Sequence, residues 1–411
     1  MSNVRGLNAV DRMFLMTIQQ QSLRYFLENQ SPDGLILDRQ ANFGPLRPLT
    51  QGWCSTAATG MGLIALALAS REPYHLISQC EAVGRIRLAL HASLEKLPED
   101  HGMMPHFYET DTNTPQGRDT FSTVDSAWLI GGALWAAGFL KDGKLERLAS
   151  QLYERVDWLH WTGGRESGLL NHGKNLNGKF LRNAWDRLNG ETILMYVLGA
   201  GAKEDRALPQ SCWKALKPFY GEVAGLRFNN ADLGLFAFGY GLDLLDMARW
   251  LPPGGVDLAA EARIAVKANY LFCREKAARF ATYSYFWGVS DGDGPGDRNG
   301  KRPYRRYAPG RSADGTAHLN ATVAAIANAP EEVLENLARA DRHSGQALRG
   351  RYGYANLNLD REWVGGDAVG IDAGAIVMAL DNYLMDDRVR QTFHSLPSVA
   401  LGMSRVGFTS Q

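Results

Sequence analysis

The chain of 411 residues has few cysteines, no excess of either charge and no long hydrophobic run. Its cysteines are widely spaced, and neither a CxxC pair nor a cysteine–histidine cluster predicts a zinc site. We therefore expect reduced, mostly packed thiols at Cys54, Cys80, Cys212 and Cys273. Lys plus Arg and Asp plus Glu both number 44, so no net field favours nucleic acid or an anionic membrane as a partner.

The apolar runs are too short for a membrane span. The longest, 61–69 and 127–140, fall below the roughly 20 residues that a membrane-spanning helix needs. The first dozen residues lack the basic region and apolar run of a secretory signal. We expect a soluble, cytoplasmic protein, with a periplasmic location as the alternative if the N-terminus was processed or truncated. No pattern indicates an oligomeric state.

Apolar and aromatic residues are plentiful. Hydrophobic residues make up 45% of the chain, which supports a sizeable core, and there are 10 Trp, 15 Tyr and 16 Phe. Aromatic faces suit sugar rings, but they also fill protein cores, so the composition leaves both interpretations open.

Helical periodicity dominates the hydrophobic pattern, and strand-like alternation is limited to 179–181 and 281–286. The predicted helices often alternate between apolar and amphipathic. They lie near 8–29, 54–71, 74–96, 122–141, 144–158, 187–200, 208–219, 231–248, 256–279, 315–327, 330–345 and 369–385.

The order of these helices predicts an all-α fold in one domain spanning 1–411. Alternating inner and outer helices joined by long glycine-rich loops are typical of an (α/α)6 barrel, in which six helical hairpins form a ring. An armadillo-like solenoid is the alternative, but it would show a fixed repeat period, and the sequence has none. No proline-rich or low-complexity linker divides the chain.

Three acids each stand at the start of an apolar helix: Asp125, Glu191 and Asp372. A helix that is apolar almost all round is buried, so each carboxyl is expected where the core opens to a polar loop. An acid in the first turn also stabilises a helix through its dipole and free amides, and this explains any one of them alone. Three together favour a single site.

Other chemistries fit the motifs less well. The loop 291–296 has the composition of a calcium loop but not the spacing of an EF-hand, and no Gly-Lys-Ser/Thr follows it to bind phosphate. A Gly-x-Ser-x-Gly elbow is absent. We predict no metal and no cofactor. Paired carboxylates are the best remaining signal, and they most often serve glycoside hydrolysis.

Motifs spread along most of the chain, from about Phe26 to Tyr383, resemble those of the glucoamylase-like domain family. That family includes the endo-β-1,2-glucanases of glycoside hydrolase family 144 and a domain of cyclic β-1,2-glucan synthases. Its Gly-Leu-x-x-Asp-Arg is matched at 34–39, its Ser-Thr-Ile-Asp-Thr-Ala is similar to 122–127, and its Leu-Tyr-Glu-Arg-Val-Asp-Trp is identical at 152–158.

The later motifs resemble the family with small changes. Its Trp-x-x-Tyr-Asn-Glu is similar to 185–191, where Gly190 is inserted before Glu191. Its Trp-Gly-Leu-Thr-Ala-Ser-Asp-Gly-Pro is similar to 287–295, which places the family aspartate at Asp293. Its Pro-Asp-Gly-Thr resembles 313–316, and its Gly-Ile-Asp-Gln-Gly-Pro resembles 370–375. The family's two histidines are absent from 236–243. Near 352–358 the family has another aspartate, and this chain has Asn356 at that position.

The resemblance implies an (α/α)6 barrel with one pocket at the mouths of the inner helices, and inverting hydrolysis of β-1,2-glucan or its oligosaccharides without a cofactor. Such an enzyme needs a protonated acid and a base that activates water. We hypothesise Glu191 as the acid, kept protonated by burial or a like-charged neighbour. Asp372 is the first choice for the base and Asp125 the second, and the other of the two would bind the sugar.

Further residues are candidates for sugar binding. For each aromatic residue core packing is the alternative, and Asp38 with Arg39 would equally form a structural ion pair. Three other functions stay open: a catalytically silent glycan-binding or scaffold protein, a transglycosylase, or another sugar-active enzyme such as an epimerase or lyase. The candidates are Asp38, Arg39, Trp53, His106, Tyr108, Trp185, Trp287, Asp293 and Asp314.

Overall fold

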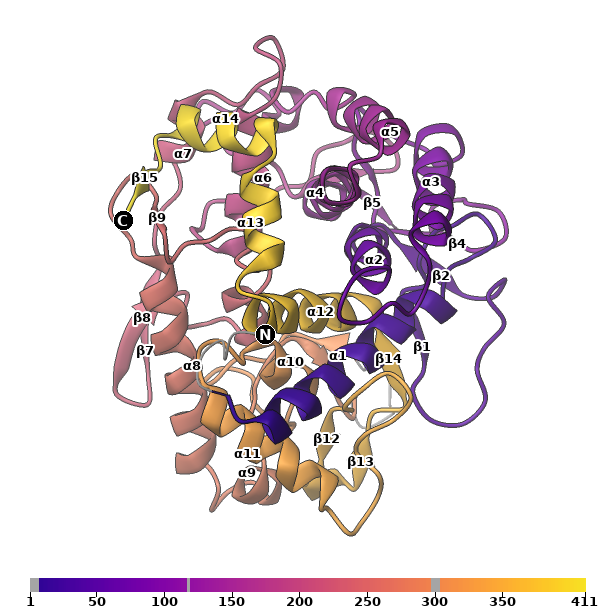
Figure 1. The fold of residues 1–411 in the computed structure, drawn as a ribbon. Coiled ribbons are helices and arrows are strands. Elements are labelled where there is room, and N and C mark those ends of the chain that lie inside the picture. The colour runs from indigo at the N-terminus through magenta and orange to yellow at the C-terminus, as the bar shows by residue number, and fades with distance from the viewer. Residues whose placement is uncertain (1–6, 117–118, 297–303) are drawn as a thin grey trace.

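The computed structural model describes residues 7–116, 119–296 and 304–411, and helices dominate them (Figure 1). The helices are α1 (Ala9–Glu28), α2 (Thr56–Ala69), α3 (Gln79–Glu95), α4 (Thr123–Leu140), α5 (Gly143–Glu154), α6 (Gly190–Ala200), α7 (Gln210–Lys214), α8 (Leu258–Glu275), α9 (Ala281–Tyr285), α10 (Leu319–Ala324), α11 (Pro330–Asp341), α12 (Gly370–Leu384), α13 (Arg388–His394) and α14 (Pro397–Val406).

The core is built on helices that are apolar all round. Every residue of α2 is buried, and in α6 only Glu191 is not. In α12 the residues that are not buried are Ile371 and Asp372, both in its first turn. Helices α1, α3, α5 and α14 pack outside this group (Figure 1). Helices α6 and α12 are therefore accessible mainly at their N-terminal ends, where Glu191 and Asp372 stand.

Helices α2 and α4 cross at very short range. A Cβ atom added to Gly132 would lie 2.0 Å from the carbonyl oxygen of Gly60, so both positions need glycine. Within the described ranges α4 alone is long and apolar enough to cross a membrane, but 78% of it is buried inside the fold. That burial is typical of a core helix, as the contact with α2 requires.

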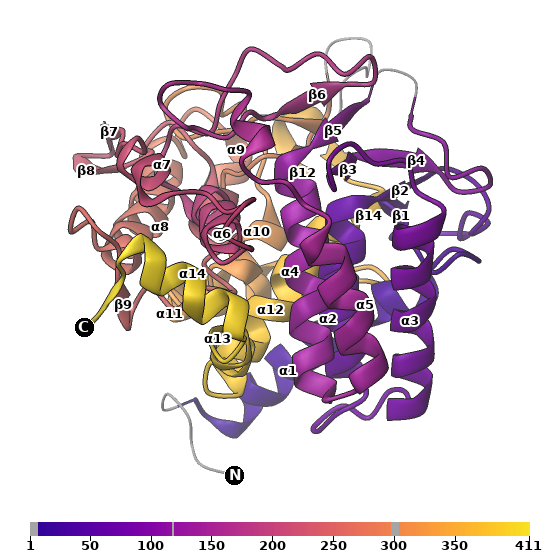
Figure 2. The same cartoon turned by 90° about the horizontal axis from the view of Figure 1, so that it is seen from above.

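Helix α14 covers the outer side of α6, as both views show (Figures 1 and 2). A Cβ added to Gly402 would lie 2.0 Å from the carbonyl oxygen of Val197 in α6. The Arg405 guanidinium donates hydrogen bonds to the carbonyl oxygens of Ala200 and Ala202, at 2.9 and 2.7 Å, where α6 ends. The C-terminal segment therefore supports the helix that carries Glu191.

The strands are short and lie in the connections. Figure 2 shows β1 to β6 gathered at one end of α2 and α4. Antiparallel pairs join β1 to β14, β2 to β4, β3 and β6 to β5, β7 to β8, β9 to β15, β10 to β11 and β12 to β13. Their bounds are β1 (Arg39–Ala41), β2 (Trp53–Ser55), β3 (Met104–Pro105), β4 (Phe107–Glu109), β5 (Thr120–Ser122), β6 (Gly173–Asn175), β7 (Tyr220–Val223), β8 (Leu226–Asn229), β9 (Trp250–Leu251), β10 (Gly292–Asp293), β11 (Tyr304–Arg305), β12 (Leu357–Asn358), β13 (Trp363–Val364), β14 (Asp367–Val369) and β15 (Thr409–Ser410).

Some predicted elements are wrong. The helix expected over 231–248 is a single 3-10 turn, η3 (Leu235–Phe238), followed by turns, because Gly241 has φ +79° and interrupts a helix. The strand expected over 281–286 is the short helix α9. In the other expected strand, 179–181, Phe180 forms an isolated bridge to Lys174. All four cysteines are free as predicted, and three of them are buried.

Candidate active site

A pocket of about 330 Å³ opens where α4 and α6 begin. Asp125 and Glu191 both line it, together with the rings of Trp128, Trp185 and Tyr240. Two of the three acids that the sequence singled out therefore share one cavity with aromatic walls.

Glu191 faces this pocket because another residue caps its helix. The side chain of Asn189 accepts the Thr192 N–H at 3.0 Å, which leaves the Glu191 carboxyl free of that task. Burial and, after it, the nearby charge of Asp125 raise the pKa of Glu191 to about 7, against a weak hydrogen bond from the Trp128 indole at 3.5 Å. Desolvation and a like charge both raise the pKa of a carboxyl group, as a catalytic acid requires, and both act on Glu191.

The inserted Gly190 has a clear structural reason. A Cβ atom on it would lie 1.9 Å from the carbonyl oxygen of Tyr240, and one on Gly241 would lie 2.0 Å from the carbonyl oxygen of Gly190. The main chain at 240–241 thus touches the start of α6 directly. This contact brings the Tyr240 ring into the pocket beside Glu191.

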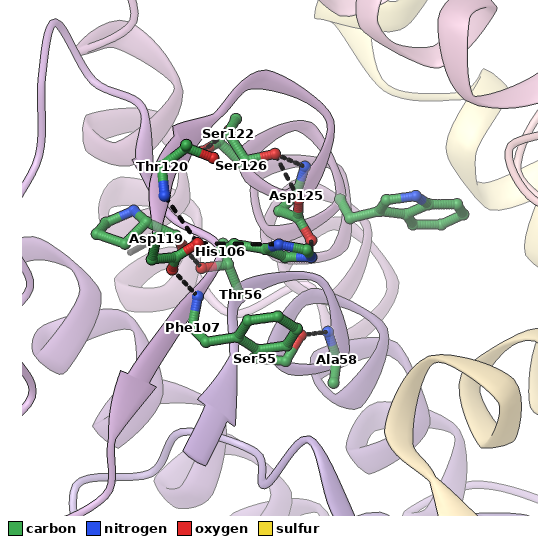
Figure 3. A network of polar contacts seen from close by, with 12 residues as sticks. Ser55, Thr56, Ala58, His106, Phe107, Asp119, Thr120, Ser122, Asp125 and Ser126 are labelled. Carbon is green, nitrogen blue, oxygen red and sulfur yellow. Dashed lines mark hydrogen bonds and ion pairs between the residues drawn. The ribbon is translucent and has the colours of Figure 1, made fainter. Parts of the chain in front are cut away.

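Asp125 lies in a network of polar contacts at the start of α4 (Figure 3). Ser122 caps the helix, and its hydroxyl donates to the Asp125 carboxylate. Nε2 of His106 lies 3.3 Å from Asp125 Oδ1, while Nδ1 of the same ring lies 4.0 Å from Asp119. Asp119 in turn accepts the backbone N–H groups of Phe107 and Thr120. His106 therefore bridges two carboxylates and lines the pocket with its ring.

Asp372 stands in the first turn of α12, at the hydroxyl end of the Tyr240 side chain, and does not line the pocket that contains Asp125 and Glu191. The Tyr240 hydroxyl donates to Asp372 Oδ1 at 3.0 Å, and the Asn320 amide donates to Oδ2. Burial raises the pKa of Asp372 to about 7, and the Tyr240 hydrogen bond opposes this rise. Its carboxyl borders two cavities of about 20 Å³, each large enough for about one water molecule.

A cluster of charges lies next to Asp372. The Arg39 guanidinium contacts Asp38 at 3.1 Å and Asp293 at 2.9 Å, and both carboxyls are buried. Burial raises the pKa of each acid, and the charge of Arg39 opposes the rise. One oxygen of Asp293 is buried without a hydrogen-bond partner among the described residues. Asp38 and Arg39 thus form the ion pair that was one of the two expectations.

Two of the remaining candidates, Trp185 and Trp53, are accessible at the pocket or at the surface. Trp185 lines the pocket, where its indole donates to Thr123 Oγ1 at 2.9 Å and stacks on His172. Trp53 is 41% exposed on β2 and does not line the pocket, but its ring contacts Phe107, which stacks on the pocket residue His106.

Three predicted sugar contacts lie elsewhere. Tyr108 is fully buried with its hydroxyl on Thr56, and Trp287 is buried with its indole donating to the Glu332 carbonyl at 3.2 Å. Both rings pack in the core, which is the alternative that the sequence left open for each aromatic residue. Asp314 does not line the pocket either, and its carboxylate accepts the N–H and hydroxyl of Thr316.

The sequence did not single out several residues of the site. Trp128, Tyr240 and Asn320 contact the acids only through packing between distant segments. Asp291 was considered only as part of a metal loop, yet burial raises its pKa to about 7 and its charge acts on Glu191. Tyr304 lines the pocket from β11.

One group outside the pocket has the composition of a metal site. Asp100, His101 and His160 each bring one ligand atom within 4.8 Å of the others, and among the described residues this is the group that could hold an ion. The Lys174 ammonium, however, lies 3.0 Å from Asp100 and 2.6 Å from His160. It supplies the positive charge there, so the group is satisfied without a metal.

Solved structures share this architecture. The endo-β-1,2-glucanase from Chitinophaga pinensis, in complex with sophorotriose and glucose, is 20% identical with a TM-score of 0.86, and the match covers 98% of this chain and 99% of that one. Two proteins described as "putative glucoamylase" are similar. The one from Bacteroides fragilis is 20% identical with a TM-score of 0.85 and coverage of 99% of both chains. The one from Bacteroides uniformis is 22% identical with a TM-score of 0.83 and coverage of 96% of this chain and 97% of that one.

At these identities the likeness shows a common fold. No curated protein matches the chain. The family described as "Putative glucoamylase" matches residues 183–397, more than half of the chain, and the matched segment contains both Glu191 and Asp372. This chain therefore belongs to that glucoamylase-like family.

Proposed function

We propose that the protein is an inverting glycoside hydrolase that cleaves a β-glucan, with β-1,2-glucan or its oligosaccharides as the substrate. The observation that carries this proposal is the Glu191 carboxyl, whose pKa is raised to about 7 inside a pocket that has aromatic walls. A carboxyl that keeps its proton near neutrality can donate it to the oxygen of the leaving sugar.

In this proposal Asp372 is the base. Asp125 lies on the same side as Glu191, because it belongs to α4, whose Trp128 donates to Glu191. Asp372 lies outside the lining of that pocket, at the hydroxyl end of the Tyr240 side chain. We place it on the opposite face of the sugar, where an inverting enzyme needs its base. Hydrogen bonds from Tyr240 and Asn320 favour the ionised form, and the adjoining cavities have room for water.

Asp125 then binds the sugar at the cleavage point. Its contacts with Ser122 and His106 fix the carboxylate in the pocket wall, where it can accept hydrogen bonds from hydroxyl groups. Its charge also helps Glu191 to keep a proton. Asp125 therefore serves both the substrate and the acid.

The proposed fold is an (α/α)6 barrel. Six elements contact one another in cyclic order, α2, α4, α6, η3, α10 and α12, and α12 contacts α2 again. In this arrangement η3, the fourth of the six elements, takes the place of an inner helix that the sequence placed over 231–248. One domain over 1–411 and a cytoplasmic location stay predictions from the sequence.

The choice of β-1,2-glucan is supported by the solved structures that share the fold. The Chitinophaga pinensis protein is named an endo-β-1,2-glucanase, and a β-1,2-glucanase from Parabacteroides distasonis is 18% identical with a TM-score of 0.81. The match to the latter covers 96% of this chain but 60% of that one. These names concern those proteins, and the linkage is proposed for this chain on that support.

Glu191→Gln tests the proposal on linear β-1,2-glucan and a panel of other glucans. We expect the wild-type protein to cleave and the variant to lose about 10²-fold or more in kcat, because the amide cannot donate an acidic proton. Proton NMR should first detect the α-anomer at the new reducing end. Glu335→Gln, an exposed glutamate paired with Arg339 on α11, is the matched control.

Other outcomes favour other functions. Equal cleavage by wild type and Glu191→Gln would remove Glu191 from the role of acid. Binding without cleavage would favour a silent glycan-binding protein, which the absent histidines and Asn356 motivate. Longer glucans among the products would indicate transfer to sugar, and an unsaturated product that absorbs in the ultraviolet would indicate a lyase.

A further inference from the structure

The sheet formed by β2 and β4 has one face in the core and one outside it. Cys54 pairs with Tyr108, and both are buried. Because side chains alternate along a strand, Trp53, Phe107 and Glu109 project from the other face, which is partly or fully exposed.

These rings continue from the pocket to the surface. The His106 ring lines the pocket and stacks on Phe107, with 4.0 Å between ring centres. Phe107 in turn lies 6.2 Å from Trp53, with the two rings tilted by 39°. We call His106, Phe107 and Trp53 the aromatic row. Its outer member, Trp53, therefore lies two ring contacts away from the pocket wall.

The Trp53 ring is held in place although it is 41% exposed. Its indole N–H donates to Glu109 Oε1 at 3.1 Å, and Glu109 is the cross-strand partner of Trp53. A ring fixed in this way loses little conformational entropy when a ligand covers it. The Glu109 carboxylate also provides hydrogen-bond acceptors beside the ring.

We propose that the aromatic row is an outer sugar-binding subsite, and that Trp53 contacts a glucose unit of a glucan chain extending out of the pocket. A pyranose ring presents apolar C–H groups on its face and hydroxyl groups at its edge. The Trp53 face and the Glu109 carboxylate are complementary to those two features. The inference rests on the proposed function, because the chain must enter the pocket beside Glu191. If Trp53 binds an outer glucose unit, the enzyme should prefer longer substrates.

Trp53→Ala and Trp53→Phe test the subsite. With β-1,2-gluco-oligosaccharides of increasing length, we expect Trp53→Ala to lower kcat/KM for long substrates about tenfold more than for the shortest ones that are cleaved. The change should fall on KM, since Trp53 is remote from the reacting bond, and Trp53→Phe should restore part of it. Tyr285→Ala, an aromatic residue that is 59% exposed on α9 and does not line the pocket, is the control.

Binding to the Glu191→Gln variant separates this inference from the proposed function. Calorimetry with the same oligosaccharides should show affinity that rises with length in Glu191→Gln and rises less when Trp53→Ala is added. If wild type cleaves glucan and Trp53→Ala affects short and long substrates equally, the subsite is wrong and the hydrolase stands. If wild type neither binds nor cleaves any glucan, both proposals are overturned.

Discussion

At the scale of single residues, Glu191 illustrates a competition between the helix and its surroundings. The start of a helix favours an ionised carboxylate, yet burial and the charge of Asp125 raise the pKa of Glu191 to about 7. Burial first, and then the charges of Asp293 and Asp38, raise the pKa of Asp372 to a similar value, although Tyr240 and Asn320 donate to it. The protonation states of two acids, rather than one, therefore change near neutrality.

These pKa values predict a narrow, bell-shaped pH profile. The proposed mechanism requires Glu191 protonated and Asp372 ionised, so kcat/KM should fall on both sides of a maximum near pH 7. Asp125→Asn removes a negative charge that raises the pKa of Glu191, so the alkaline limb should move to lower pH. The measurement is kcat/KM from pH 5 to 9. The Asp125→Asn variant should also lose affinity for the substrate, because Asp125 is proposed to bind the sugar.

Asp291→Asn is the matched control for this profile, because Asp291 is a weaker influence on Glu191 than Asp125. The alkaline limb of the Asp291→Asn profile should shift less than that of the Asp125→Asn profile. An Asp125→Asn enzyme with an unchanged alkaline limb would show that another group, not Glu191, sets that limb.

At the scale of elements, the backbone contacts between helices are as decisive as the side chains. Gly131 and Gly132 are neighbours in α4 but have different surroundings. A Cβ on Gly132 would lie 2.0 Å from the Gly60 carbonyl oxygen, whereas a Cβ on Gly131 would meet nothing closer than 3.7 Å. In isolation, helix α4 would be stabilised by alanine at either position, because alanine has a higher helix propensity than glycine.

We therefore expect opposite effects from two adjacent substitutions. Gly132→Ala should force α2 and α4 apart and lower the free energy of unfolding by about 2 kcal/mol or more, as overpacked cores do. Gly131→Ala should change it by less than about 1 kcal/mol, in the direction of greater stability. Chemical denaturation measures both, and equal effects of the two variants would contradict the close crossing of α2 and α4.

The buried helices were the part of the fold that the sequence predicted well. Helices α2, α4, α6 and α12 are apolar all round, so their continuous apolar runs are visible in the sequence, as are the leading acids of α4, α6 and α12. The segment 231–248 is equally apolar, but its glycines allow turns that no hydrophobic pattern distinguishes from a helix. Helices α13 and α14 are short and were not predicted.

The site was predictable only in part, for a related reason. Acids at helix starts can be recognised one at a time, whereas Tyr240 and Asn320 act on Asp372 from segments 132 and 52 residues away. The sequence also could not distinguish Trp185, which lines the pocket, from Trp287, which packs in the core. Both are aromatic residues in loop segments, and the difference arises from tertiary packing.

At the scale of the whole molecule, Asp243 links stability to pH. It is buried, its Oδ2 has no hydrogen-bond partner among the described residues, and Arg390 approaches no closer than 3.9 Å. Burial raises its pKa to about 7. Between about pH 4 and pH 7 the folded protein keeps a proton here that the unfolded chain has lost, so this group's contribution to stability falls as pH rises.

Asp243→Asn should remove the loss of stability that the ionisation of Asp243 causes as pH rises. We expect the Tm of the variant, relative to wild type, to be higher at pH 8 than at pH 5, because asparagine stays neutral at both. Arg390 keeps its contacts with Asp387 and the Leu242 carbonyl. Asp205→Asn, an exposed aspartate, is the control and should show no such difference. A relative Tm independent of pH would mean that Asp243 is ionised in the folded protein at pH 5.

The packing of α14 on α6 bears on the order in which the protein is made. The ribosome completes Glu191 long before residues 397–406, so the outer side of α6 has no cover for the last half of synthesis. An apolar helix in that state exposes surface that chaperones bind, and the proposed active site should form only after α14 has emerged. A fusion partner or tag that displaces α14 would therefore affect activity although no residue of α14 lines the pocket.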